Sequence, residues 1–90
     1  TSEIKNVFAT SGCLIEGNVK NSILFRKVKV GRGAVIHNSI LLPKVEIGED
    51  VVLDGVIIDK NVQIKKGMQL IGNNENPVII EKNQEIGGGF

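Results

Sequence analysis

The chain has 90 residues, a net charge of +1 at neutral pH and a single cysteine. This length excludes more than one small domain, the interspersed charges exclude a strongly basic surface for nucleic acid or membranes, and one cysteine excludes an internal disulfide framework. With three Phe and no Trp or Tyr, the chain also has few side chains on which bases could stack. We therefore expect a soluble, cytoplasmic protein with no nucleic-acid partner, no membrane partner and no metal site.

Residues 7–19 are the first predicted element, an imperfect copy of a pattern that repeats every seventeen residues over 19–35, 36–52 and 53–69. A fixed short period is typical of a solenoid, in which each unit stacks on the next. In the first copy Val19 follows Ile15 by only four positions, so one corner of the first turn should be short.

Within the units at 19–69, aliphatic residues recur at spacings of six, six and five. A second, often smaller residue stands two positions before most of them, and residues two apart point to the same side of a strand. The predicted inward line is Val19, Leu24, Val30, Ile36, Leu41, Ile47, Leu53, Ile58, Ile64 and Leu70. Three short strands per unit, separated by turn residues, predict an all-β fold: a single-stranded parallel β-helix of about four triangular coils.

The same register predicts an outward apolar ladder. If Ser22 and Leu24 point inward, Ile23 must point outward, and its equivalents in the other units must do the same. The predicted interface residues, including two at the following corner, are Phe8, Ile23, Phe25, Ile40, Leu42 and Ile57. A contiguous apolar stripe usually marks a contact surface, although β-branched residues are also common on any strand face.

No residue stands out as catalytic. His37, the only histidine, aligns with Lys20 and Asp54 in the other units and should be solvated. Cys13 occupies an inward slot and reads as a small buried hydrophobe. Asn21 and Asn38 occupy matching turn positions, where asparagine tolerates a left-handed backbone or bonds to the neighbouring coil.

The pattern breaks after Leu70. Residues 73–77 are predicted to form a loop and residues 78–80 a short strand, in a short C-terminal cap that covers the open end of the helix. We assign residues 1–86 to the β-helix domain, which we expect to be a fragment of a longer chain, and residues 87–90 to a flexible tail.

Four motifs carry a family resemblance: G-C-x-I-x-G from Gly12, N-S-x-L-F from Asn21, N-S-x-L-x-P from Asn38 and V-I-x-D from Val56. In this order they resemble the C-terminal domain of bacterial glucose-1-phosphate adenylyltransferase, a left-handed hexapeptide-repeat β-helix. The ending IGNNENPVIIEKNQEI is more similar to the non-catalytic homologue of the GlgD type.

The resemblance implies an N-terminal nucleotidyltransferase domain in the parent chain, which joins ATP and glucose 1-phosphate to give ADP-glucose and pyrophosphate with magnesium. The fragment itself should bind no cofactor and have no transferase activity. Its implied role is assembly and regulation in glycogen biosynthesis. Its implied partners are its own N-terminal domain and a homo- or hetero-oligomer with the catalytic subunit.

Lys60 is the one candidate effector contact that the resemblance implies. Some catalytic members have an arginine at this position that helps to hold a sugar-phosphate activator. Lysine keeps the charge but lacks the bidentate fork, and this chain has no arginine-rich tail to complete such a pocket.

Two alternative functions remain open at this point. The chain could be part of a hexapeptide-repeat acyltransferase that uses His37 as general base. It could also be the related C-terminal helix of a mannose-1-phosphate guanylyltransferase.

Overall fold

A computed structural model of the chain describes residues 3–87, which form thirteen strands and no helix. Accordingly, no helix in this range is long and apolar enough to cross a membrane. The strands are β1 (Ile4–Ala9), β2 (Leu14–Ile15), β3 (Asn18–Leu24), β4 (Lys29–Val30), β5 (Val35–His37), β6 (Ile40–Leu41), β7 (Glu46–Ile47), β8 (Val52–Asp54), β9 (Val56–Ile58), β10 (Gln63–Ile64), β11 (Gln69–Ile71), β12 (Val78–Ile80) and β13 (Glu85–Ile86).

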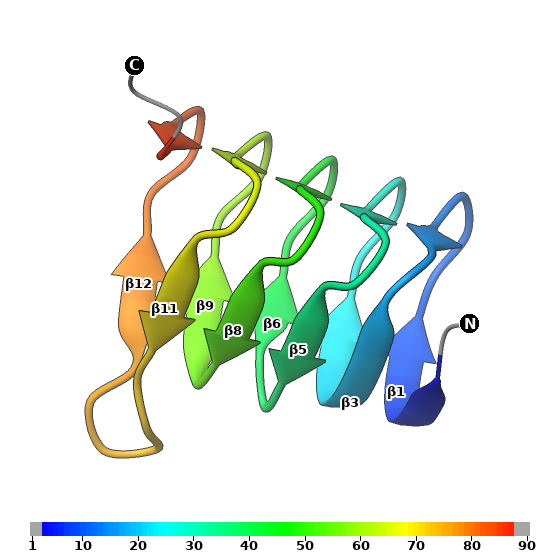
Figure 1. Cartoon of the computed structure of the whole chain (residues 1–90), viewed down its shortest axis with the longest axis horizontal. Coiled ribbons are helices and arrows are strands. Elements are labelled where there is room, and N and C mark those ends of the chain that lie inside the picture. The colour runs from blue at the N-terminus through cyan, green and yellow to red at the C-terminus, as the bar shows by residue number, and fades with distance from the viewer. Residues whose placement is uncertain (1–2, 88–90) are drawn as a thin grey trace.

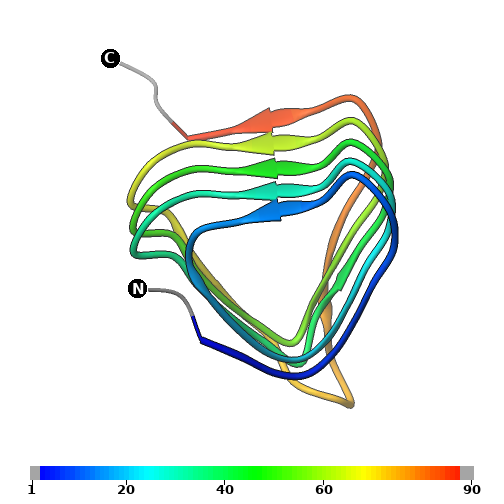
Figure 2. The same ribbon diagram turned by 90° about the vertical axis from the view of Figure 1, so that its right-hand side faces the viewer.

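The strands wind into a stack of turns (Figure 1), and the stack has the form of a triangular prism (Figure 2). One face consists of β1, β3, β6, β9 and β12, and a second consists of β5, β8 and β11 together with the first half of β3, which bends around the shared corner. The third face is the five-stranded sheet β13-β10-β7-β4-β2. All these pairs are parallel.

The prism is a left-handed helix of about four turns. Figure 2 looks along the axis from the N-terminal end, and the chain runs anticlockwise as it recedes from the viewer. The predicted fold class is therefore confirmed, including the hand that the family resemblance implied.

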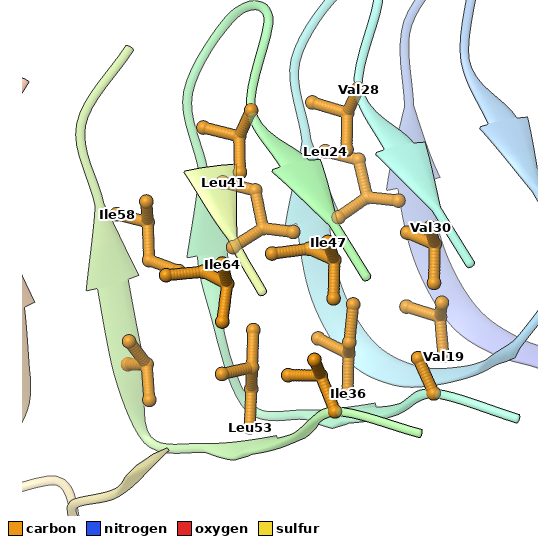
Figure 3. Packing of buried hydrophobic residues seen from close by; sticks show 14 of the residues in the cluster. Val19, Leu24, Val28, Val30, Ile36, Leu41, Ile47, Leu53, Ile58 and Ile64 are labelled. Carbon is orange, nitrogen blue, oxygen red and sulfur yellow. The ribbon is translucent and has the colours of Figure 1, made fainter. Parts of the chain in front are cut away.

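The core is the inward line that the spacing predicts. Leu24, Leu41 and Ile58 stack in register on one face, and Ile36 and Leu53 stack on the next. All five side chains are fully buried and point into the prism (Figure 3). Because aliphatic side chains fill the interior, the helix is a packed core and not a channel.

Two serines also lie in the interior, and their hydroxyls are satisfied by the backbone. The Ser22 hydroxyl donates to Lys20 O at 2.9 Å and accepts a bond from Ser39 N at 3.1 Å. The Ser39 hydroxyl repeats this arrangement one turn later, donating to His37 O and accepting from Val56 N. Buried polar groups in proteins are nearly always hydrogen-bonded. Serine is tolerated at this inward position because both hydroxyls have such partners.

Asparagines at one corner adopt a left-handed backbone and bond to each other. Asn6, Asn21 and Asn38 have φ values of 55°, 52° and 54°. Asn6 Nδ2 donates to Asn21 Oδ1 at 2.7 Å, and Asn38 Nδ2 donates to Asp54 Oδ1 at 3.1 Å. Both structural roles predicted for Asn21 and Asn38 are therefore present at once.

The short corner of the first turn is also present. Ile15 pairs with Val30 and Val19 with Ile36, so the first turn crosses this corner with two residues fewer than the next. Gly17 lies in the gap, where a Cβ atom would come within 2.5 Å of Ala34 O. Glycine allows the backbone to take this shorter path because it has no Cβ.

The predicted cap is a continuation of the helix. Beyond a loop at residues 73–77, Ile80 pairs with Ile58 and Ile86 with Ile64, in the register of the earlier turns. The segment thus covers the edges of β9 and β10, and within residues 3–87 no strand lies beyond it. The predicted tail at 87–90 lies, after Gly87, outside the described residues.

Candidate docking face

Each strand of the β1-β3-β6-β9-β12 face presents one apolar side chain outward. Parallel pairing places Phe8 beside Ile23, Ile23 beside Ile40, and Ile40 beside Ile57, as the sequence predicts. The same register continues for one more strand, which places Ile79 beside Ile57. These five residues form a continuous column that we call the apolar ladder.

The ladder is most exposed at its two ends. Phe8 and Ile79 are each 65% exposed, Ile23 is 39% exposed, and Ile40 and Ile57 are half-buried by their neighbours. Single exposed apolar residues are normal on a protein surface, whereas a contiguous stripe across five strands is typical of a contact surface.

Phe25 and Leu42 widen the ladder at the following corner. Phe25 N donates to Leu41 O and Leu42 N donates to Ile58 O, both at 2.9 Å, so the two residues occupy equivalent places in successive turns. Phe25 is 37% exposed and Leu42 is half-buried. All six residues predicted for the interface therefore lie on one side of the prism.

Ile79 is the member of the ladder that the sequence prediction missed. A loop insertion shifts its turn, so that Asn61 and Asn83 bond across 22 residues, whereas equivalent residues of the regular turns lie 17 apart. A signal was present, because the triplet Val-Ile-Ile occurs at both 56–58 and 78–80.

Lys60 lies at the corner beside the ladder, in a shallow hollow of about 350 Å³. Arg26 and Lys44 from the two preceding turns line the same hollow, together with Asn61 and Asn83. Lys60 is exposed, and its backbone N–H donates to Asp59 Oδ1. The structure thus surrounds the predicted effector contact with further positive charge, although Lys60 itself stays a prediction.

His37 and Cys13 are not members of the ladder. His37 is half-buried and pairs with Lys20 and Asp54, the alignment expected from the repeat. Cys13 packs against the core, and its Sγ donates to Phe25 O at 3.1 Å. Neither side chain belongs to an arrangement of nucleophile, base and orienting group in the described residues.

The described residues also hold no group of three or more His, Cys, Asp or Glu side chains that could bind a metal ion.

The family follows from comparison with known sequences. The profile of the family described as GlmU-like, C-terminal hexapeptide matches residues 1–80. This chain belongs to that family. The hexapeptide domain is 49% identical over 81 residues to the glycogen biosynthesis protein GlgD of Bacillus subtilis, which covers 90% of the chain and 24% of the relative.

Two shorter matches agree with this relationship. GlgD of Geobacillus stearothermophilus is 54% identical over 33 residues, which is 37% of the chain and 10% of the relative. A glucose-1-phosphate adenylyltransferase of Clostridium perfringens is 46% identical over 35 residues, 39% of the chain and 9% of the enzyme. The hexapeptide domain is thus related to proteins of glycogen biosynthesis and spans a quarter or less of their length.

Proposed function

We propose that this hexapeptide domain is the assembly and regulatory domain of a glucose-1-phosphate adenylyltransferase-like protein of glycogen biosynthesis. In this proposal the apolar ladder packs against a nucleotidyltransferase domain, either its own or that of a catalytic subunit. The domain itself catalyses no nucleotidyl transfer.

The observation that carries the proposal is the unbroken apolar ladder. Five outward side chains in register present a continuous apolar stripe on a sheet, and aliphatic side chains pack the interior of the described turns. Burying one Ile side chain from water contributes about 1.5 to 3 kcal/mol, so a partner that covers several rungs would gain substantial affinity. The similarity to GlgD and to the adenylyltransferase supports the kind of partner.

Replacing Ile23 and Ile40 with Asp tests the docking role. Each change removes about 2 kcal/mol of apolar burial and places a charge in the interface, so we expect affinity to fall by about thirtyfold or more per residue. The measurement is sedimentation of the chain with the Clostridium perfringens adenylyltransferase as probe. The fold should persist, because both side chains point outward.

Leu14→Asp is the matched control. Leu14 is 54% exposed and points outward from β2, on a different face of the prism. This variant should bind the probe as the unaltered chain does. Equal binding by the Ile23→Asp/Ile40→Asp variant, or no binding by the unaltered chain, would contradict the proposal.

The regulatory part of the proposal rests on Lys60. Lys60 shares this hollow with Arg26 and Lys44. The positively charged side chains of these three residues have several N–H groups that can donate hydrogen bonds to a phosphate group. We expect glucose 1-phosphate to shift the backbone amide signals of this corner in NMR titrations. Lys60→Ala should weaken the interaction about two- to fivefold, as for an exposed ion pair. Lys29→Ala, on the β4 face, should have no effect.

A further inference from the structure

The two borders of the apolar ladder differ in charge. On one side lie Asn6, Asn21 and Asn38, whose amides bond to one another and to Asp54, and the column directly before them carries Lys5, Lys20 and Asp54. On the other side, directly after Phe25, Leu42 and Asp59, the chain turns a corner that carries five cations. They are Arg26, Lys27, Lys44, Lys60 and Lys82, which we call the cationic border.

The cationic border has little internal compensation. The carboxylates nearest in sequence are Asp59 and Glu81, and Asp59 Oδ1 already accepts the Lys60 backbone N–H. Across residues 3–87 the one ion pair is Lys66 with Glu49, at 3.9 Å, at the corner opposite the ladder face. The charges of Arg26, Lys44 and Lys60 therefore meet in one solvent-filled hollow without an ion-pair partner in the described chain.

We propose that the partner of the ladder is a nucleotidyltransferase domain whose contact surface combines an apolar stripe with a row of carboxylates along one edge. This inference rests on the proposed function and specifies the chemistry of its partner. The apolar stripe covers the ladder, and the carboxylates pair with Arg26 and Lys44. Because the cationic border carries more net positive charge than the asparagine border, where Lys5 and Lys20 are offset in part by Asp54, the pairing also favours one orientation of the partner.

A second copy of this chain does not meet the requirement. The cationic border offers Asp59 and Glu81 against five cations, and the asparagine border offers Asp54 against Lys5 and Lys20, so two such faces would bring net positive charge together in either arrangement. Like charges brought together across an interface oppose association. The occupant is therefore a different protein surface, and the nucleotidyltransferase domain is the one that the proposed function supplies.

Charge reversal at the cationic border separates this inference from the docking role of the ladder. The test variant is Arg26→Glu/Lys44→Glu, and the probe is again the Clostridium perfringens adenylyltransferase, studied by stopped-flow association. Complementary charge mainly accelerates encounter, so the association rate should fall about tenfold or more at about 0.1 M salt. At about 1 M salt, where charges are screened, the variant and the unaltered chain should associate at similar rates.

Lys65→Glu/Lys66→Glu is the matched control, because it changes the net charge equally at the corner that faces away from the ladder. Its association rate should stay within about twofold of the unaltered chain. Circular dichroism checks that both variants keep the β-helix, and Arg26→Gln/Lys44→Gln provides a milder pair, with an expected slowing of about threefold or more.

The outcomes distinguish the two proposals. Equal slowing by the two charge-reversed variants would overturn the inference, since it would reflect net charge alone. Unchanged association of Arg26→Glu/Lys44→Glu, with binding lost in Ile23→Asp/Ile40→Asp, would also overturn it and leave the docking role intact. Failure of the unaltered chain to bind the probe would overturn both.

Discussion

Leu41→Ala should reduce the free energy of unfolding by about 2 to 5 kcal/mol. Leu41 is fully buried in a central turn, in register with Leu24 on one side and Ile58 on the other. Truncation leaves a cavity between two rigid layers of backbone, which cannot close around it because the hydrogen-bonded strands hold their spacing. Since small domains are stable by only about 5 to 15 kcal/mol, urea unfolding should show a large shift of the midpoint.

Leu42→Ala is the natural control, because Leu42 is the same residue type one position later. It points outward at the corner and is half-buried. We expect a loss below about 1 kcal/mol, as for most surface substitutions. Equal losses in the two variants would contradict the assigned register, because a slip by one residue exchanges the inward and outward side chains.

Gly55→Ala should destabilise the helix by about 2 to 5 kcal/mol, for two separate reasons. Gly55 has a φ of +69°, a left-handed conformation that costs an L-residue about 1 to 2 kcal/mol. A Cβ atom there would also lie 2.7 Å from Gly72 C and 2.9 Å from Asn73 N, and the backbone would have to move apart at a cost of about 1 to 3 kcal/mol. Thermal and urea unfolding would measure the sum.

Gly67→Ala isolates the first reason from the second. Gly67 has a φ of +79°, but no atom lies within 4 Å of the position that a Cβ would occupy. Its variant should lose only the conformational part, so the difference between the two variants reports the close approach of Gly55 to Gly72 and Asn73, where the 73–77 loop begins. Similar losses at both positions would show that this corner relaxes freely.

The inward residues illustrate how much of the fold the sequence predicts. Successive side chains of a strand point alternately inward and outward, and the repeat of seventeen residues requires the same choice in every turn. Only one assignment of the interior side chains meets both conditions, and Leu24, Leu41 and Ile58 are all buried as expected. The outward ladder follows from the same alternation, since Ile23 must face away from the side that Leu24 faces. Phe8, Ile40 and Ile57 then align because identical units stack in register.

Ile79 and Arg26 show where sequence reasoning stopped. The insertion at residues 73–77 breaks the period, and only strand pairing shows that Ile79 returns to the register of Ile57. Arg26 and Lys44 read as ordinary turn residues in the sequence, because nothing in a linear pattern says that two corners eighteen residues apart share a hollow with Lys60.

The sequence by itself determined the core, the number of turns and the outward position of Ile23, because each depends on local alternation within a fixed period. Only the tertiary structure decided that the ladder extends to Ile79 and that a cationic border runs along one side of it and an asparagine border of lower net charge along the other. These features depend on which residues of different turns come together across a corner. The pairing and bending of the stacked strands decide which residues come together. An insertion such as the 73–77 loop changes how far apart such residues lie along the chain, while they remain neighbours in space.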